Sequence, residues 1–278
     1  MSSSTRSQKA LATSVRHQGM WPGRMPYLAV GTGEPLLFIP GLGPHNEPPK
    51  GMERRFQAAQ IMPFADHRKV WWVNRKPYLD PDVTMADIAT QYATAMRARL
   101  ETPVDVIGVS TGGSVALQLA IDHPDVVKRL VILSAAYRLG EAGAQAQRRV
   151  GQLIRAGEPR KAAAEIMSML ATDDGAQPVL GGIGWLMGKA MFGKAGADML
   201  ATIDAEDEFN VRDRLHEITA PTLVVGGDKD HFYSAELFRQ TADLIPGARL
   251  ILYPGRGHVP MAGTQLVPDV MRFLDAPG

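Results

Sequence analysis

The sequence predicts an α/β fold with a doubly wound, mostly parallel sheet. The first observation behind this prediction is a set of short, apolar, β-prone runs without polar alternation, as expected of strands that are covered on both faces. They fall at 36–39, 70–73, 104–107, 130–133, 223–225 and 250–253. The second observation is that stretches with a helical pattern separate several of these runs. Alternation of strand and helix implies right-handed crossovers between parallel strands.

The clearest helical pattern runs from Thr84 to Leu100. Apolar side chains recur there every four residues on one face, at Ile88, Tyr92 and Met96. Thr84 together with Asp87 resembles a capping box, which predicts that the helix begins at this point. Further helices are predicted at 112–121, 235–245 and 266–274.

The alternation of strand and helix stops between about Tyr137 and Ile218, where no strand-like run occurs. The segments 141–155 and 159–170 have an amphipathic helical pattern, whereas the glycine-rich segment 181–196 is predicted to be broken and flexible. We therefore predict a helical lid at 137–215, inserted into a core domain formed by 21–136 and 216–278. Residues 1–20 are predicted to be a flexible N-terminal tail.

Composition narrows the classes of function. Thirty basic residues balance twenty-nine acidic ones, so no strong field favours nucleic acid or another polyanion. The absence of cysteine excludes disulfides, thiolate metal sites and a cysteine nucleophile. No apolar run reaches the roughly eighteen residues that a membrane span requires, and the first residues lack the apolar core of a signal peptide. We expect a soluble, cytoplasmic protein without a membrane span.

The most informative motif is Gly108-Val109-Ser110-Thr111-Gly112, which follows a predicted buried strand and opens a predicted helix. This is the G-x-S-x-G pattern in the strand-turn-helix context that defines a nucleophile elbow. Glycine is needed on both sides because the turn is strained and the strand and helix approach closely. The motif predicts that Ser110 is a nucleophile exposed at the carboxyl edge of the sheet.

A serine nucleophile needs a general base, and His258 is the predicted one. It comes directly after the glycine-rich loop 254–257, which follows the last predicted strand. This loop can bring an imidazole across the sheet edge. The other histidines stand in the tail, at a helix end or in polar connections, except that His45 and His231 remain candidate pocket residues.

The third member of a triad is a carboxylate that fixes the histidine tautomer, and the segment after strand 223–225 offers Asp228 and Asp230. At this point the chain resembles the α/β-hydrolase superfamily, in the order nucleophile, acid, base. In that family the acid stands three residues after the strand-ending glycine. The resemblance therefore implies Asp230, with Asp228 as the alternative.

The resemblance also covers Phe38-Ile39-Pro40-Gly41-Leu42-Gly43, which matches the strand and glycine turn that the family places beside the serine. It implies an oxyanion hole formed by the backbone N–H groups of Leu42 and Thr111. Many members have His-Gly where this chain has Pro40-Gly41. Any role of that histidine in holding the loop must be filled differently here or be absent.

These patterns together predict a serine hydrolase acting on an ester, a thioester, a lactone or a β-diketone carbon–carbon bond. The substrate is expected to be a partly apolar small molecule. No nucleotide-binding glycine loop and no metal signature occurs, so we expect neither cofactor nor metal. An acyltransferase and a ligand-binding receptor remain alternatives, because the same fold supports both.

Overall fold

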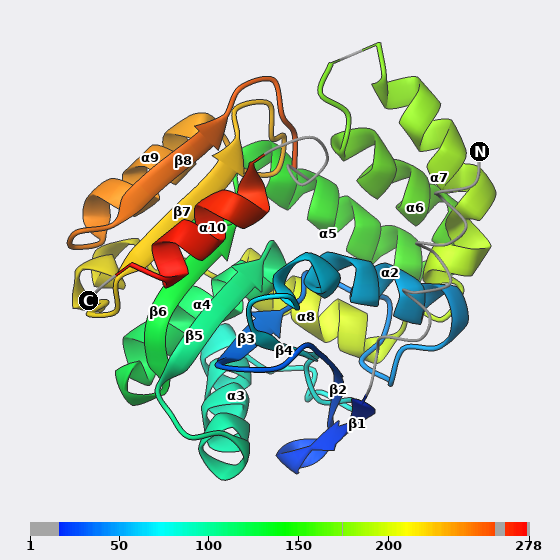
Figure 1. Ribbon diagram of the computed structural model, residues 1–278. Helices are drawn as coiled ribbons and strands as arrows, with labels where there is room; N and C mark the ends of the chain where they lie inside the picture. Colours follow the sequence, from blue (N-terminus) through cyan, green and yellow to red (C-terminus); the bar gives the residue numbers. More distant parts are fainter. Residues whose placement is uncertain (1–16, 174, 259–264, 277–278) are drawn as a thin grey trace, which may run out of the picture.

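The computed structural model describes residues 17–173, 175–258 and 265–276 (Figure 1). Within these residues, eight strands form one sheet in the order β1-β2-β4-β3-β5-β6-β7-β8. From β4 through to β8 all neighbours are parallel, which confirms the predicted doubly wound, mostly parallel sheet. The strands are β1 His17–Trp21, β2 Met25–Val30, β3 Pro35–Ile39, β4 Lys69–Val73, β5 Val104–Val109, β6 Val127–Leu133, β7 Thr222–Gly227 and β8 Arg249–Tyr253.

One edge of the sheet is a hairpin that the sequence did not predict. Strand β1 pairs antiparallel with β2, and β2 pairs antiparallel with β4. Residues 17–20, which the sequence assigned to a flexible tail, are therefore part of β1, and the remainder of that predicted tail, 1–16, lies outside the described residues. The strand was missed because its residues 17–20 are half-exposed or exposed on the sheet edge, so they show no apolar run.

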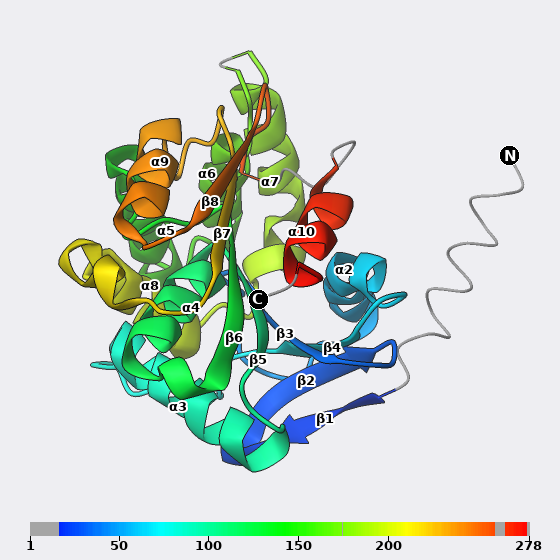
Figure 2. The ribbon, with the colours of Figure 1, turned by 60° about the vertical axis from the view of Figure 1, so that its left-hand side comes forward.

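Helices cover both faces of the sheet, as the edge-on view in Figure 2 shows. Helices α3, α4 and α9 lie on one face, and α2 and α10 lie on the other. The Thr84 hydroxyl accepts a hydrogen bond from the Asp87 N–H, and the Asp87 carboxylate accepts one from the Thr84 N–H, which confirms the predicted capping box. The bounds are α2 Gly51–Ile61, α3 Met85–Arg99, α4 Thr111–Asp122, α9 Ala235–Leu244 and α10 Leu266–Leu274.

Between β6 and β7 the described residues form four α-helices that pack over one end of the sheet (Figure 1). They are α5 Glu141–Arg155, α6 Pro159–Met169, α7 Gln177–Phe192 and α8 Ala197–Asp207. The prediction of a broken, flexible segment at 181–196 is wrong, because α7 is a continuous helix as far as Phe192. Its glycines permit close packing on α6: a Cβ at Gly184 would lie 2.4 Å from the Ala163 carbonyl oxygen. Short 3-10 turns occupy 22–24, 62–64, 124–126 and 212–217.

The hydrophobic core consists of two layers, one on each face of the sheet, and a third cluster among the inserted helices. Trp71 and Trp72 of β4 are 5% and 1% exposed and lie in the two opposite layers, so both are core residues, as the sequence suggested. Among the described helices, none is long and apolar enough to cross a bilayer.

Candidate active site

Ser110 occupies the sharp turn between β5 and α4. Its φ of 52° and ψ of −127° are a strained conformation for a residue other than glycine. The flanking glycines make the turn sterically feasible. A Cβ at Gly108 would lie 2.4 Å from the Gly112 carbonyl oxygen. A Cβ at Gly112 would lie 2.2 Å from the Ile39 carbonyl oxygen. The close approach expected of the G-x-S-x-G motif is therefore present at this turn.

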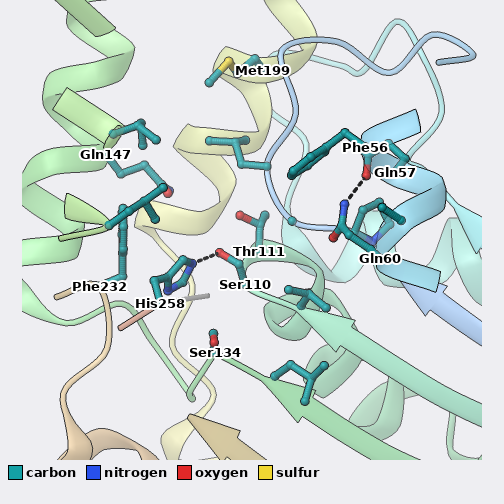
Figure 3. A pocket seen from close by; sticks show the side chains of 18 of the residues that line it. Phe56, Gln57, Gln60, Ser110, Thr111, Ser134, Gln147, Met199, Phe232 and His258 are labelled. Atoms are coloured by element: carbon teal, nitrogen blue, oxygen red, sulfur yellow. Dashed lines mark hydrogen bonds between the residues drawn. The ribbon is translucent and has the colours of Figure 1, made fainter. Parts of the chain in front are cut away.

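His258 comes after β8 and lies between Ser110 and Asp230. Its Nε2 is 3.0 Å from the Ser110 hydroxyl oxygen (Figure 3), and its Nδ1 is 2.9 Å from Oδ2 of Asp230. An ionised carboxylate can only accept, so Nδ1 donates and the Nε2 lone pair faces the serine hydroxyl. The imidazole also packs against two aromatic rings, with centroid distances of 4.5 Å to Phe232 and 5.9 Å to Tyr233.

The two candidate carboxylates after β7 point to different partners. Asp230 is 7% exposed, and its Oδ1 accepts hydrogen bonds from the backbone N–H groups of Phe232 and Tyr233, at 2.8 and 3.1 Å. These bonds leave Oδ2 directed at His258. Asp228 instead accepts a 2.7 Å hydrogen bond from the Gly255 N–H and holds the turn after β8. Of the two residues, only Asp230 contacts the histidine in the described structure.

The two residues predicted to form an oxyanion hole, Leu42 and Thr111, come from two different elements near Ser110. Thr111 is the first residue of α4, so its N–H has no carbonyl four residues earlier in the helix and lies at the positive end of the helix dipole. Leu42 lies on the loop after β3, whose Gly41 packs against the serine: a Cβ at Gly41 would lie 3.2 Å from Cβ of Ser110. Leu42 and Thr111 line the same cavity as Ser110.

A cavity of about 590 Å³ opens in front of Ser110 and His258 (Figure 3). Among the described residues, its lining contains no aspartate, glutamate, lysine or arginine. Most of its wall is apolar, and the inserted helices and α2 supply much of it. The apolar lining residues on or next to these helices are Phe56, Ala59, Ile166, Leu170, Phe192 and Met199.

Sequence analysis missed a buried carboxylate beneath the serine. Glu206 of α8 is 1% exposed, and its oxygens accept hydrogen bonds from Thr111 Oγ1 (2.7 Å), Ser114 Oγ (2.9 Å) and Gln147 Nε2 (3.1 Å). Burial raises the pKa of Glu206, while these hydrogen bonds and the positive charge of Arg75 act to lower it. In the sequence, Glu206 is one acid in the acidic run 204–213, and nothing there distinguishes it from its exposed neighbours.

Ser134 is a second serine in the cavity that sequence analysis did not identify. It follows β6, has a φ of 48°, and lines the cavity near Ser110 and His258 (Figure 3). Its hydroxyl is buried and has no hydrogen-bond partner among the described residues. A positive φ at a non-glycine residue beside a cavity is typical of a functional site, but φ is not readable from the sequence.

The remaining candidates lie elsewhere. His45 and His231 do not line the cavity. The His45 ring lies beside Glu53 on a surface loop, and His231 faces another hollow of the surface. Within the part of the chain that the structure describes, no group of three or more histidine, aspartate or glutamate side chains could hold a metal ion.

Comparison with known proteins gives the same architecture. Residues 36–265 match the model of the Alpha/beta hydrolase family. The pimeloyl-[acyl-carrier protein] methyl ester esterase of Neisseria meningitidis serogroup C is 29% identical over 175 residues, 60% of this chain and 67% of that protein. A candidate non-heme bromoperoxidase of Mycobacterium tuberculosis is 26% identical over 243 residues, 82% and 88% of the two chains.

Among solved structures, the α/β hydrolase MGS-M2 from a deep-sea metagenome library superposes with a TM-score of 0.79 at 14% identity, over 94% of this chain and 98% of that one. At this identity the likeness concerns the fold alone. The family match, by contrast, covers most of the chain, including the elbow and the strands that carry the candidate acid and base. This protein therefore belongs to the alpha/beta hydrolase family.

Proposed function

We propose that this protein is a serine hydrolase that cleaves a carboxylic ester or a related acyl bond through an acyl-enzyme. The observation that carries the proposal is the pair of hydrogen bonds from Ser110 to His258 and from His258 to Asp230, at 3.0 and 2.9 Å, facing an uncharged cavity. A nucleophile, a base and an orienting carboxylate within hydrogen-bond reach are the signature of nucleophilic acyl transfer.

In the acylation step, the Ser110 oxygen attacks the substrate carbonyl carbon while Nε2 of His258 takes the hydroxyl proton. The carbonyl π electrons move to oxygen, and the N–H groups of Leu42 and Thr111 stabilise the resulting oxyanion. When the oxyanion collapses, the bond to the leaving alkoxide breaks, and the imidazolium returns the proton to it. Asp230 stays ionised and stabilises the imidazolium.

Deacylation repeats these steps with water as the nucleophile. His258 removes a proton from water as its oxygen attacks the acyl carbon, and then returns the proton to Ser110 as the acid is released. Each turnover therefore consumes one ester and one water and yields one acid and one alcohol, with the protein unchanged.

The cavity favours an uncharged, largely apolar acyl group. Burying a carboxylate or ammonium without a partner costs several kcal/mol, and no lysine, arginine, aspartate or glutamate of the described residues lines the wall. The methyl ester esterase among the relatives supports an ester ahead of the thioester, lactone and β-diketone alternatives.

Residues 137–215 act as the lid of this site in the proposed function, and 21–136 with 216–278 form the catalytic core. Side chains from α6, α7 and α8 form part of the cavity wall: Ile166, Leu170, Phe192 and Met199. The inserted helices would therefore set the shape of the acyl site, while the core supplies the reacting groups.

A fluorophosphonate probe tests the proposal, because it reacts rapidly only with an activated serine beside an oxyanion hole. The parent protein should be labelled, and Ser110→Ala should not be. Ser134→Ala is the matched control, since Ser134 lines the same cavity without a hydrogen-bonded base among the described residues. Labelling that persists in Ser110→Ala, or that moves to Ser134, contradicts the assignment.

The reaction class is tested with p-nitrophenyl esters from acetate to octanoate, beside a lactone and a thioester. Ester hydrolysis with multiple turnovers supports the proposal. Labelling of Ser110 without turnover favours a receptor, and product formation that depends on an added alcohol or amine favours an acyltransferase.

A further inference from the structure

A fully buried arginine holds the loop that carries Leu42. Arg75 stands two residues after β4 and is 0% exposed. Its guanidinium donates hydrogen bonds to the carbonyl oxygens of Gly41, from Nη2 at 3.1 Å, and of Pro40, from Nη1 at 3.4 Å. Two consecutive carbonyl groups of the loop are thus bound by one rigid, planar side chain.

This contact determines which way the Leu42 N–H points. The carbonyl of Gly41 and the N–H of Leu42 belong to one peptide group, and in a planar trans peptide the two point in opposite directions. Arg75 binds the carbonyl from the buried side. The N–H of Leu42 is therefore directed away from Arg75. Gly41 packs against Ser110, and both Gly41 and Leu42 line the cavity.

A buried glutamate, Glu206, holds the segment that carries Thr111 through hydrogen bonds. Glu206 accepts hydrogen bonds from the side chains of Thr111 and Ser114, which lie one turn apart at the start of α4. Gln147 of α5 donates a third bond, and the Tyr233 hydroxyl lies 3.4 Å from Oε1. The first turn of α4, which presents the Thr111 N–H, is therefore fixed to an inserted helix.

Burial acts on the pKa of both side chains, and each has a small opposing effect on the pKa of the other. Burial lowers the pKa of Arg75, and the negative charges near it, including that of Glu206, oppose this effect. The charge of Arg75 in turn lowers the pKa of Glu206 against the effect of burial. A buried ion without a partner is strongly unfavourable, so both side chains depend on the hydrogen bonds described above.

We propose that Arg75 and Glu206 are positioning residues of the oxyanion hole: Arg75 orients the N–H of Leu42, and Glu206 fixes the helix turn that carries the N–H of Thr111. The proposal rests on the proposed serine hydrolase function. It also accounts for Pro40-Gly41, the sequence at which many family members have His-Gly, because Arg75 holds this loop from the end of β4.

The experiment compares Arg75→Met, Arg75→Lys and Glu206→Gln with the parent in p-nitrophenyl ester hydrolysis, with rates corrected for the folded fraction. Loss of one oxyanion donor lowers kcat by about 10²- to 10³-fold in other enzymes, so Arg75→Met should lower kcat by roughly 10²-fold with KM little changed. Arg75→Lys should recover part of the loss, because the ammonium can reach a carbonyl without matching the fork geometry. Glu206→Gln should give a smaller loss, because its amide oxygen still accepts.

Binding of n-butylboronic acid distinguishes a positioning role of Arg75 and Glu206 from an effect on folding stability alone. The boronate forms a tetrahedral adduct with a nucleophilic serine and mimics the transition state, so its affinity should fall by the same factor as kcat/KM. A buried Asp105, near the other end of β5 and 3.8 Å from Arg129, provides the matched control. Asp105→Asn removes a buried charge at the far end of β5, so it should leave kcat and boronate affinity unchanged whatever its melting temperature.

Variants of Arg75 and Glu206 that keep the parent kcat once corrected for folding overturn the proposal. The same conclusion follows if they change only KM, or if Asp105→Asn lowers kcat as much. If Arg75→Met does not fold, Arg75→Lys and Glu206→Gln still test the proposal, because a positioning role lowers kcat and leaves KM little changed. A parent protein that neither reacts with the fluorophosphonate nor turns over esters overturns the proposed function itself, a different result from an active parent with unaffected variants.

Discussion

Asp230 holds His258 with one carboxylate oxygen and the protein backbone with the other. Oδ2 lies 2.9 Å from Nδ1 of the histidine, while Oδ1 accepts hydrogen bonds from two successive backbone N–H groups. The carboxylate therefore cannot rotate without losing all three contacts. This rigidity is what keeps the imidazole in the tautomer whose Nε2 faces Ser110.

Asp230→Asn should accordingly preserve the fold and lower kcat by several orders of magnitude, about 10⁴-fold in the best-studied serine triad, because the amide favours the wrong tautomer. Asp228→Asn is the matched control, since an amide oxygen can still accept from the Gly255 N–H. It should keep nearly the parent kcat. Steady-state kinetics on both variants decide the question, and a large loss confined to Asp228→Asn would reverse the assignment of the acid.

Substitution by alanine should have opposite effects on the unfolding free energy at Gly112 of α4 and at Gly182 of α7. A Cβ at Gly112 would lie 2.2 Å from the Ile39 carbonyl oxygen, so Gly112→Ala should cost about 1–3 kcal/mol of unfolding free energy and slow fluorophosphonate labelling. Gly182 of α7 has nothing within 4 Å of such a Cβ. Gly182→Ala should raise the unfolding free energy by up to about 1 kcal/mol, through helix propensity. Urea unfolding measures both, and a stabilised Gly112→Ala would argue against the tight elbow.

Leu170, at the end of α6, should influence the preferred acyl length. It lines the cavity, so Leu170→Ala should move the optimum of kcat/KM toward longer p-nitrophenyl esters, and Leu170→Phe toward shorter ones. Leu186 of α7 is the matched control, because it is 73% exposed and away from the cavity. An unchanged length profile in both Leu170 variants would mean that the acyl chain occupies another part of the cavity.

The capping box of α3 predicts a pH-dependent contribution to stability. Hydrogen bonds from the Thr84 side chain and backbone lower the pKa of Asp87. A depressed pKa means that the ionised carboxylate stabilises the folded state above the ordinary aspartate pKa, and that this contribution disappears as pH falls through the depressed value. Asp87→Ala should therefore be less stable than the parent at pH 6, by no more than about 1 kcal/mol because the pair is exposed, and the difference should shrink below pH 4.

Urea unfolding of Asp87→Ala and the parent at several pH values measures this difference. Asp213→Ala, whose side chain is 93% exposed, serves as the control and should show no comparable change with pH. A difference between Asp87→Ala and the parent that stays constant down to pH 3 would show that the carboxylate charge does not contribute.

Most of the sheet could be read from the sequence, because buried parallel strands need apolar side chains on both faces and so leave continuous apolar runs. The edge strand β1 could not, since its residues 17–20 are half-exposed or exposed and show no apolar run. The sequence also predicted a broken, flexible segment where the structure has the continuous helix Gln177–Phe192. Its glycines suggested a break, whereas they are compatible with helix where α6 packs closely against them.

The sequence by itself determined the candidate nucleophile and base. Ser110 is identified by a local pattern, because a strained turn between strand and helix requires glycines at fixed spacing. His258 is identified by its position after the last strand. Between Asp228 and Asp230, the residues alone left both open, and the resemblance favoured Asp230. The tertiary structure decided which of the two carboxylates contacts the imidazole.

Only the tertiary structure decided how the site is held. Arg75 and Glu206 follow no motif, and each contacts residues far away in the sequence: Arg75 binds Gly41, and Glu206 binds Thr111. Such charges are tolerated in the interior only when the complete fold supplies their hydrogen-bond partners. The cavity wall depends in the same way on how the inserted helices pack. Local sequence patterns thus specify the candidate reacting groups, whereas long-range packing specifies their support and the cavity in front of them.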